Sequence, residues 1–115
     1  MEVTLLVDLV KGTPTAWPRL ETDHSYAVVG SARPLEDAWR IGNVAMVDWL
    51  AELYGLDRLD AYQLLSQTSL CPIANVCDPN YSVVTKVPKD LLPASTAYGG
   101  LHRHLRDLAS GLRLR

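Results

Sequence analysis

The chain has 115 residues, of which 48% are hydrophobic and 21% charged, a composition that excludes a disordered or fibrous protein. A chain of this length forms one compact domain, so a second domain is not expected. The formal net charge of -2 gives no general attraction to nucleic acid or anionic lipid, and neither partner is expected. No apolar run reaches the roughly 18 residues of a membrane-spanning helix, and Met1-Glu2 does not open a leader peptide, so we expect a cytoplasmic protein.

The first third of the chain predicts short β-strands. Residues 3–10 are apolar and rich in β-branched side chains, and the turn-forming run Lys11-Gly12-Thr13-Pro14 follows them. We expect a return strand over residues 16–20, at a sheet edge because Pro18 cannot donate a ladder hydrogen bond. Residues 26–29 predict a third short strand that ends at Gly30-Ser31.

A long amphipathic helix is predicted from Pro34, which suits a first helical turn, with Ser31 as a nearby cap. Spacings of three and four residues place one apolar stripe on this helix: Leu35, Trp39, Gly42, Met46, Trp49 and Leu53. The stripe is expected to be core or interface. Gly42 costs roughly 1 kcal/mol relative to alanine inside a helix, which predicts that another backbone approaches closely there.

A second helix is predicted to follow after a short connection. Gly55 suits a left-handed C-cap that ends the first helix, and Asp57 with Asp60 resembles a capping box that begins the second. This helix is expected to run to about Thr68 and to bury an apolar side of Ala61, Tyr62, Leu64 and Leu65. The two helices should pack as a hairpin because their connection is short.

The remaining sequence completes an α+β protein of β-β-α-α-β order. Residues 72–76 form a short apolar segment, Asp78-Pro79-Asn80 predicts a turn, and the β-branched residues 81–87 predict a further strand closed by Pro88. Segregation of strands from helices favours this class over a doubly wound sheet. We therefore divide the chain into an α+β region, residues 1–94, and a basic helical tail, residues 95–115, whose arginines are Arg103, Arg106, Arg113 and Arg115.

Several segments match, in order and spacing, the C-terminal portion of acetamidase/formamidase proteins. They are Trp17-Pro18-Arg19-Leu20-Glu21-Thr22, Val29-Gly30-Ser31, Asp37-Ala38-Trp39-Arg40, Met46-Val47-Asp48-Trp49-Leu50, Leu53-Tyr54-Gly55-Leu56, Asp60-Ala61-Tyr62-Gln63-Leu64-Leu65-Ser66, Val76-Cys77-Asp78-Pro79 and Val87-Pro88-Lys89-Asp90. The resemblance covers about residues 2–93. It implies a hydrolase of carbon–nitrogen bonds that converts small linear amides to ammonia and a carboxylate.

The chain departs from this family in length. Family members are considerably longer, and their Gly-Gly-Asn-x-Asp type motif and their histidine- and acid-bearing segments lie upstream of the matched portion. We therefore expect a partial amidohydrolase, without a complete active site of its own, that associates with the missing upstream part or forms a homo-oligomer. The alternative is a non-catalytic α+β module that self-associates through the Trp39–Met46–Trp49 stripe or its edge strands.

Candidate catalytic residues lie between two predicted strands. Amide hydrolysis needs an activated nucleophile, a proton donor for the leaving nitrogen and donors for the oxyanion. Glu21, Asp23 and His24 form the densest titratable cluster, and Glu21 or His24 is the candidate general base, with His24 alternatively a metal ligand. An ordinary connecting loop offers the same residue types, so the cluster alone does not establish a site.

We predict structural rather than catalytic roles for the other reactive side chains. Cys71 and Cys77 are expected to be reduced, buried thiols, and their spacing with His102 and His104 matches no common zinc pattern. Cys71 as a nucleophile would need a base to lower its pKa. Hydroxyls at the end of the second helix, Ser66, Thr68 and Ser69, suit terminal carbonyls better than catalysis, and Asp78 suits a turn. No metal site or cofactor is predicted for this chain, although a complete family member could use a divalent metal.

Overall fold

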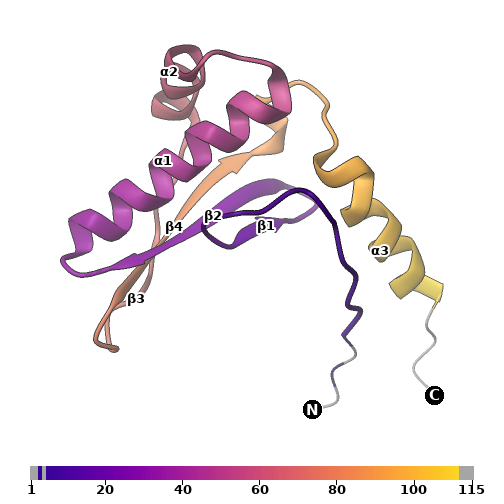
Figure 1. Ribbon diagram of the computed structural model, residues 1–115, viewed down its shortest axis with the longest axis horizontal. Coiled ribbons are helices and arrows are strands. Elements are labelled where there is room, and N and C mark those ends of the chain that lie inside the picture. Colours follow the sequence, from indigo (N-terminus) through magenta and orange to yellow (C-terminus); the bar gives the residue numbers. More distant parts are fainter. Residues whose placement is uncertain (1–2, 4, 112–115) are drawn as a thin grey trace. The chain divides into compact units, whose positions relative to one another are not determined.

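The computed structural model describes residue 3 and residues 5–111 of the chain. These residues form two compact units. One unit contains residues 15–95, and the other contains the described residues at both ends of the chain. The larger unit contains the sheet, the helical hairpin and every residue of the pocket discussed below (Figure 1).

An antiparallel sheet of four strands forms the base of the larger unit. The strands are β1 (Arg19–Glu21), β2 (Ser25–Ala32), β3 (Ile73–Asn75) and β4 (Tyr81–Pro88), in the spatial order β1-β2-β4-β3. The two long strands β2 and β4 pair along their whole length, from Ser25 opposite Pro88 to Ala32 opposite Tyr81. Together with the helices between β2 and β3, this confirms the predicted α+β class.

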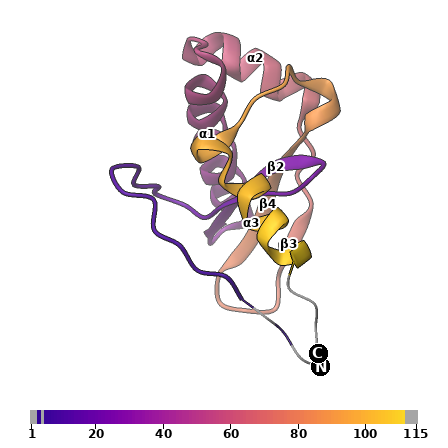
Figure 2. The ribbon, with the colours of Figure 1, turned by 90° about the vertical axis from the view of Figure 1, so that its right-hand side faces the viewer.

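Two helices lie on one side of the strands, α1 (Leu35–Tyr54) and α2 (Arg58–Thr68), as Figure 2 shows. Gly55 ends α1 in the left-handed conformation, with φ 63°, as the sequence predicted. The Asp57 carboxylate caps α2 by accepting hydrogen bonds from the backbone amides of Leu59 and Asp60, at 2.7 and 3.0 Å. The short connection between these caps packs the helices as the predicted hairpin.

The core lies between α1 and the sheet. Strand residues alternate between faces, so Val83, Thr85 and Val87 of β4 all point toward α1, where they are buried. Met46 and Trp49 of α1 are fully buried against them. Full burial of side chains of this size contributes about 1.5–3 kcal/mol each, which makes this layer the main source of stability.

Two glycines allow α1 to approach the sheet closely, as predicted from Gly42. A Cβ atom built on Gly42 would lie 2.6 Å from Oγ1 of Thr85, and one built on Gly30 of β2 would lie 2.7 Å from the backbone nitrogen of Gly42. Real Cβ atoms essentially never come this close. The helix therefore crosses β2 and β4 at a point where the hydrogen atoms of glycine fit but a Cβ atom does not.

The structure corrects three predictions about the first strands and helix. Residues 3 and 5–10 belong to no strand, and most of their apolar side chains are strongly exposed, because no strand among the described residues pairs with them. The return strand begins only at Arg19, after Pro18. Ser31 lies in β2, and the N-cap of α1 is Pro34, which has no side-chain cap.

The apolar stripe of α1 is only partly buried. Met46 and Trp49 are core residues, as predicted, but Trp39 is 47% exposed. Tyr62 of α2 is also exposed, whereas Ala61 and Leu65 are buried. Cys77, expected to be buried, is exposed in the turn between β3 and β4, and both cysteines are free thiols.

The smaller unit contains the helix α3 (Leu101–Gly111), within the segment expected to be a basic tail. A turn with positive φ values at Tyr98, Gly99 and Gly100 precedes this helix. Arg113 and Arg115 lie outside the described residues. Of the helices in the described part of the chain, none is long and apolar enough to cross a membrane.

Candidate functional site

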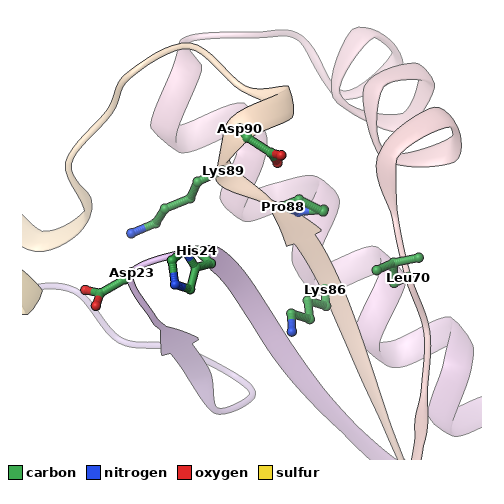
Figure 3. Close-up of a pocket in the computed structure, with 7 residues that line it drawn as sticks. All are labelled: Asp23, His24, Leu70, Lys86, Pro88, Lys89 and Asp90. Carbon is green, nitrogen blue, oxygen red and sulfur yellow. The ribbon is translucent and has the colours of Figure 1, made fainter.

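A pocket of about 480 Å³ opens where β4 ends beside the β1–β2 turn (Figure 3). Because Thr85 and Val87 point toward α1, the alternating residues Lys86 and Pro88 line the pocket on the opposite face of the sheet. The β1–β2 turn supplies Asp23 and His24. The remaining lining residues are Leu70, Lys89 and Asp90.

An ion pair joins the pocket to the edge of the sheet. Nζ of Lys89 lies 2.7 Å from Oε1 of Glu21, and both side chains are largely buried, with 23% and 16% exposed. The same ammonium lies 4.6 Å from the ring centroid of Tyr26, a favourable cation–π distance. The backbone amide of Lys89 also donates to the carbonyl of His24 at 2.8 Å, so the turn and the end of β4 are held together.

Two tyrosines near this ion pair act as hydrogen-bond donors. The Tyr26 hydroxyl donates to the Ser95 carbonyl and the Tyr54 hydroxyl to the Pro93 carbonyl, both at 3.2 Å. Burial, with a smaller contribution from the Glu21 carboxylate and then Tyr54, raises the pKa of Tyr26 to about 12, and burial raises the pKa of Tyr54. Both phenols therefore remain protonated at neutral pH and tie the segment after β4 to the core.

The turn that carries His24 is fixed by Thr22. Oγ1 of Thr22 accepts hydrogen bonds from the backbone amides of His24 and Ser25, at 3.2 and 3.0 Å. The amide of Thr22 donates in turn to the Ser25 carbonyl at 2.9 Å. This arrangement holds the backbone of the turn rigid while the His24 side chain stays exposed at the pocket.

The two candidate bases differ in what surrounds them. His24 lines the pocket together with Asp23, whereas the Glu21 carboxylate is engaged by Lys89 and is not among the pocket residues. The His24 side chain is exposed at the pocket, whereas the Glu21 side chain is largely buried in its ion pair. His24 is thus better placed than Glu21 for proton transfer in this pocket, and Glu21 is better placed to hold Lys89.

Sequence reasoning missed the basic and acidic residues at the end of β4. Lys86, Lys89 and Asp90 line the pocket, yet Lys89 lies 68 residues from its partner Glu21. Only the pairing of β1 with β2 and of β2 with β4 brings them together. The available signal was the Val87-Pro88-Lys89-Asp90 segment, which sequence analysis had used for family resemblance alone.

The other candidate residues have structural partners. Ser66 and Thr68 donate hydrogen bonds to the carbonyls of Gln63 and Leu64, both at 2.8 Å, as their position near the helix end predicted. Asp78 accepts a hydrogen bond from the side-chain amide of Asn75 within the β3–β4 turn. Among residues 3 and 5–111, no group of three or more histidine, cysteine or acidic side chains is placed to hold a metal ion.

No protein-family model and no curated protein matches the chain. Among solved structures, the crystal structure of an acetamidase from Yersinia enterocolitica is similar, with a TM-score of 0.70 and 40% sequence identity. The similarity covers 74% of this chain and 26% of that chain. Fold and sequence together define an acetamidase-related α+β protein.

The relationship to the acetamidase family, predicted from the sequence motifs, is therefore confirmed. This chain spans about a quarter of the length of the acetamidase that it matches.

Proposed function

We propose that this chain is one part of an amidohydrolase that converts small linear amides, such as formamide or acetamide, to ammonia and a carboxylate. The observation that carries the proposal is the 40% identity with an acetamidase over 74% of this chain. Because the match covers only 26% of that acetamidase, the active site would be completed by polypeptide that this chain does not contain.

Exposed apolar side chains near the beginning of the chain support a missing partner surface. Leu5, Val7 and Leu9 are 80%, 92% and 74% exposed, in a segment without a strand partner among the described residues. Burial of apolar surface is favourable by about 25 cal/mol per Å². A segment this apolar gains stability when another part of an enzyme covers it.

In the completed site, His24 is our candidate for the general base. Its side chain lies at the pocket, on a turn held by Thr22, where it could accept a proton from an attacking water. Glu21 would act indirectly, by holding Lys89 at the pocket wall. A divalent metal in a complete enzyme and the cytoplasmic location both stay predictions.

Ammonia release tests the proposal. The 115-residue chain is assayed with formamide, acetamide and propionamide, alone and after mixing with the Yersinia enterocolitica acetamidase from which the matched portion has been removed. Each reaction is run with and without added divalent metal. We expect no release by either polypeptide alone and release by the mixture.

Variants locate the contribution of this chain. His24→Ala should lower release by the mixture about 10²-fold or more, as loss of a general base does, whereas His104→Ala on α3 should leave it unchanged. Glu21→Ala should have a smaller effect than His24→Ala. A stable complex without activity would refute the amidase proposal and favour a non-catalytic module, whereas activity of the isolated chain would show that its own site is complete.

A further inference from the structure

An apolar groove of about 550 Å³ lies between the beginning of α1 and the β3 edge of the sheet. Leu35 and Trp39 of α1 line one side and Ile73 of β3 lines the other. The remaining lining residues are Pro34, Cys71, Val83 and Glu36, whose carboxylate pairs with Arg40. Trp39 is 47% and Ile73 55% exposed, although both are large apolar residues. This surface is separate from the pocket at His24, because the side chains of Cys71 and Val83 lie on the opposite face of the sheet from Lys86.

The strand beside the groove has an open edge. β3 is the last strand of the sheet, and the carbonyls of Leu70 and Pro72 accept hydrogen bonds from the amides of Lys86 and Val84, at 2.8 and 3.0 Å. Because successive strand residues alternate in direction, the amide and carbonyl of Ile73 point away from β4. The edge therefore offers hydrogen-bonding groups directly beside an apolar groove.

This edge carries no charged side chain, although β3 is only three residues long, Pro72 precedes it, and its register with β4 shifts between Ile73 and Asn75. Sheet edges in monomers commonly carry lysine or another charge, yet β3 consists of Ile73, Ala74 and Asn75. Val76, directly after the strand, is 55% exposed. The outward amide and carbonyl of Ile73 are groups with which an added segment can pair.

We infer that the groove between Trp39 and the β3 edge is the docking surface for an extended apolar segment of the rest of the amidase. This inference rests on the proposed function, and the occupant follows from the comparison, because 26% coverage leaves most of the acetamidase outside the match. The segment would pair with Ile73 through its backbone and insert alternate side chains against Trp39.

Binding measurements on the full 115-residue chain test this inference. The probe is the Yersinia enterocolitica acetamidase without its matched portion, and binding is followed by biolayer interferometry, with light scattering to obtain the mass of the complex. Ile73→Lys and Trp39→Gln should each weaken binding by about tenfold or more, as loss of a central apolar contact does. Tyr62→Gln is the matched control, since Tyr62 is an aromatic residue 61% exposed on α2 and should leave binding unchanged.

Circular dichroism and thermal unfolding of the three variants establish that each is folded. Wild-type-like binding by folded Ile73→Lys and Trp39→Gln would overturn the inference, as would absence of binding by the wild-type chain. The wild-type chain could instead self-associate without binding the probe, and Ile73→Lys could abolish that self-association. This result would also overturn the inference and would make a second copy of the chain the occupant of the groove. A complex that forms as expected but releases no ammonia would instead refute only the proposed function.

Discussion

Replacing Gly42 by alanine has two opposite effects on stability, a gain in helix propensity and a steric overlap with Thr85. Alanine is favoured over glycine inside a helix by about 1 kcal/mol. The added Cβ would lie 2.6 Å from Oγ1 and 3.5 Å from Cβ of Thr85, whose side chain is completely buried and short. Overpacking of this kind costs about 1–3 kcal/mol, so steric repulsion exceeds the gain in helix propensity.

We expect Gly42→Ala to lower the free energy of unfolding, measured by urea unfolding, by up to about 2 kcal/mol. Each kcal/mol lost should lower Tm by about 4–8 °C. Gly30→Ala should cost more, about 3 kcal/mol, since its Cβ would meet backbone atoms of α1 that cannot rotate away. Gly111→Ala, whose Cβ would meet nothing within 4 Å, is the control.

A double-mutant cycle identifies the cause. Thr85→Ala removes the atom nearest to the new methyl group, so Gly42→Ala should cost clearly less in the Thr85→Ala background. A Gly42→Ala variant more stable than the wild type, by the amount that helix propensity predicts, would refute the close approach of α1 to the sheet.

Three further predictions concern the charged and capping residues. Lys89→Met leaves the largely buried Glu21 carboxylate without its ion-pair partner and should lower the free energy of unfolding by about 1–3 kcal/mol. Adding Glu21→Gln should restore part of this free energy. If it restores none, the ion pair has no role in stability. The pKa of Tyr26, about 12, exceeds the value of about 10 of an unfolded tyrosine. Its contribution to stability is therefore fully present below pH 10 and is lost as the pH rises to 12. In urea unfolding, the free energy of unfolding of Tyr26→Phe should depend less on pH over this range than that of the wild type. Hydrogen bonds from the amides of Asp60 and Leu59 lower the pKa of Asp57, so its contribution to stability is present above about pH 4 and is lost on further acidification. Thermal unfolding measured against pH should show this loss in the wild type and not in Asp57→Asn. Asp57→Ala should lower Tm at neutral pH.

Local sequence signals predicted the helical hairpin and the central strands well. Gly55 and Asp57 specify the helix ends through their own backbone conformation and side chain, and Gly42 marked the contact with the sheet. The strand predicted over residues 3–10 is wrong for residues 3 and 5–10, because β-branched composition reports strand propensity, whereas a strand also requires a partner. Trp39 has the periodicity of a core residue, but periodicity does not reveal how much of each side chain on the stripe the rest of the protein covers.

The candidate site was predicted only in part. His24 was identified because titratable residues between strands stand out locally, and the structure places it at a pocket. The engagement of Glu21 by Lys89 depends on the register of three strands, which no local pattern contains. Catalytic roles for Glu21 and His24 stay predictions.

The pairing of β2 with β4 has a consequence for folding kinetics. These strands meet across residues 33–80, so chain closure must bring together segments far apart in the sequence before their ladder forms. Contacts of this separation slow folding, whereas α1 and α2 can form from neighbouring residues. The helical hairpin should therefore precede the sheet, and until β4 docks, apolar segments remain open to aggregation or to a chaperone.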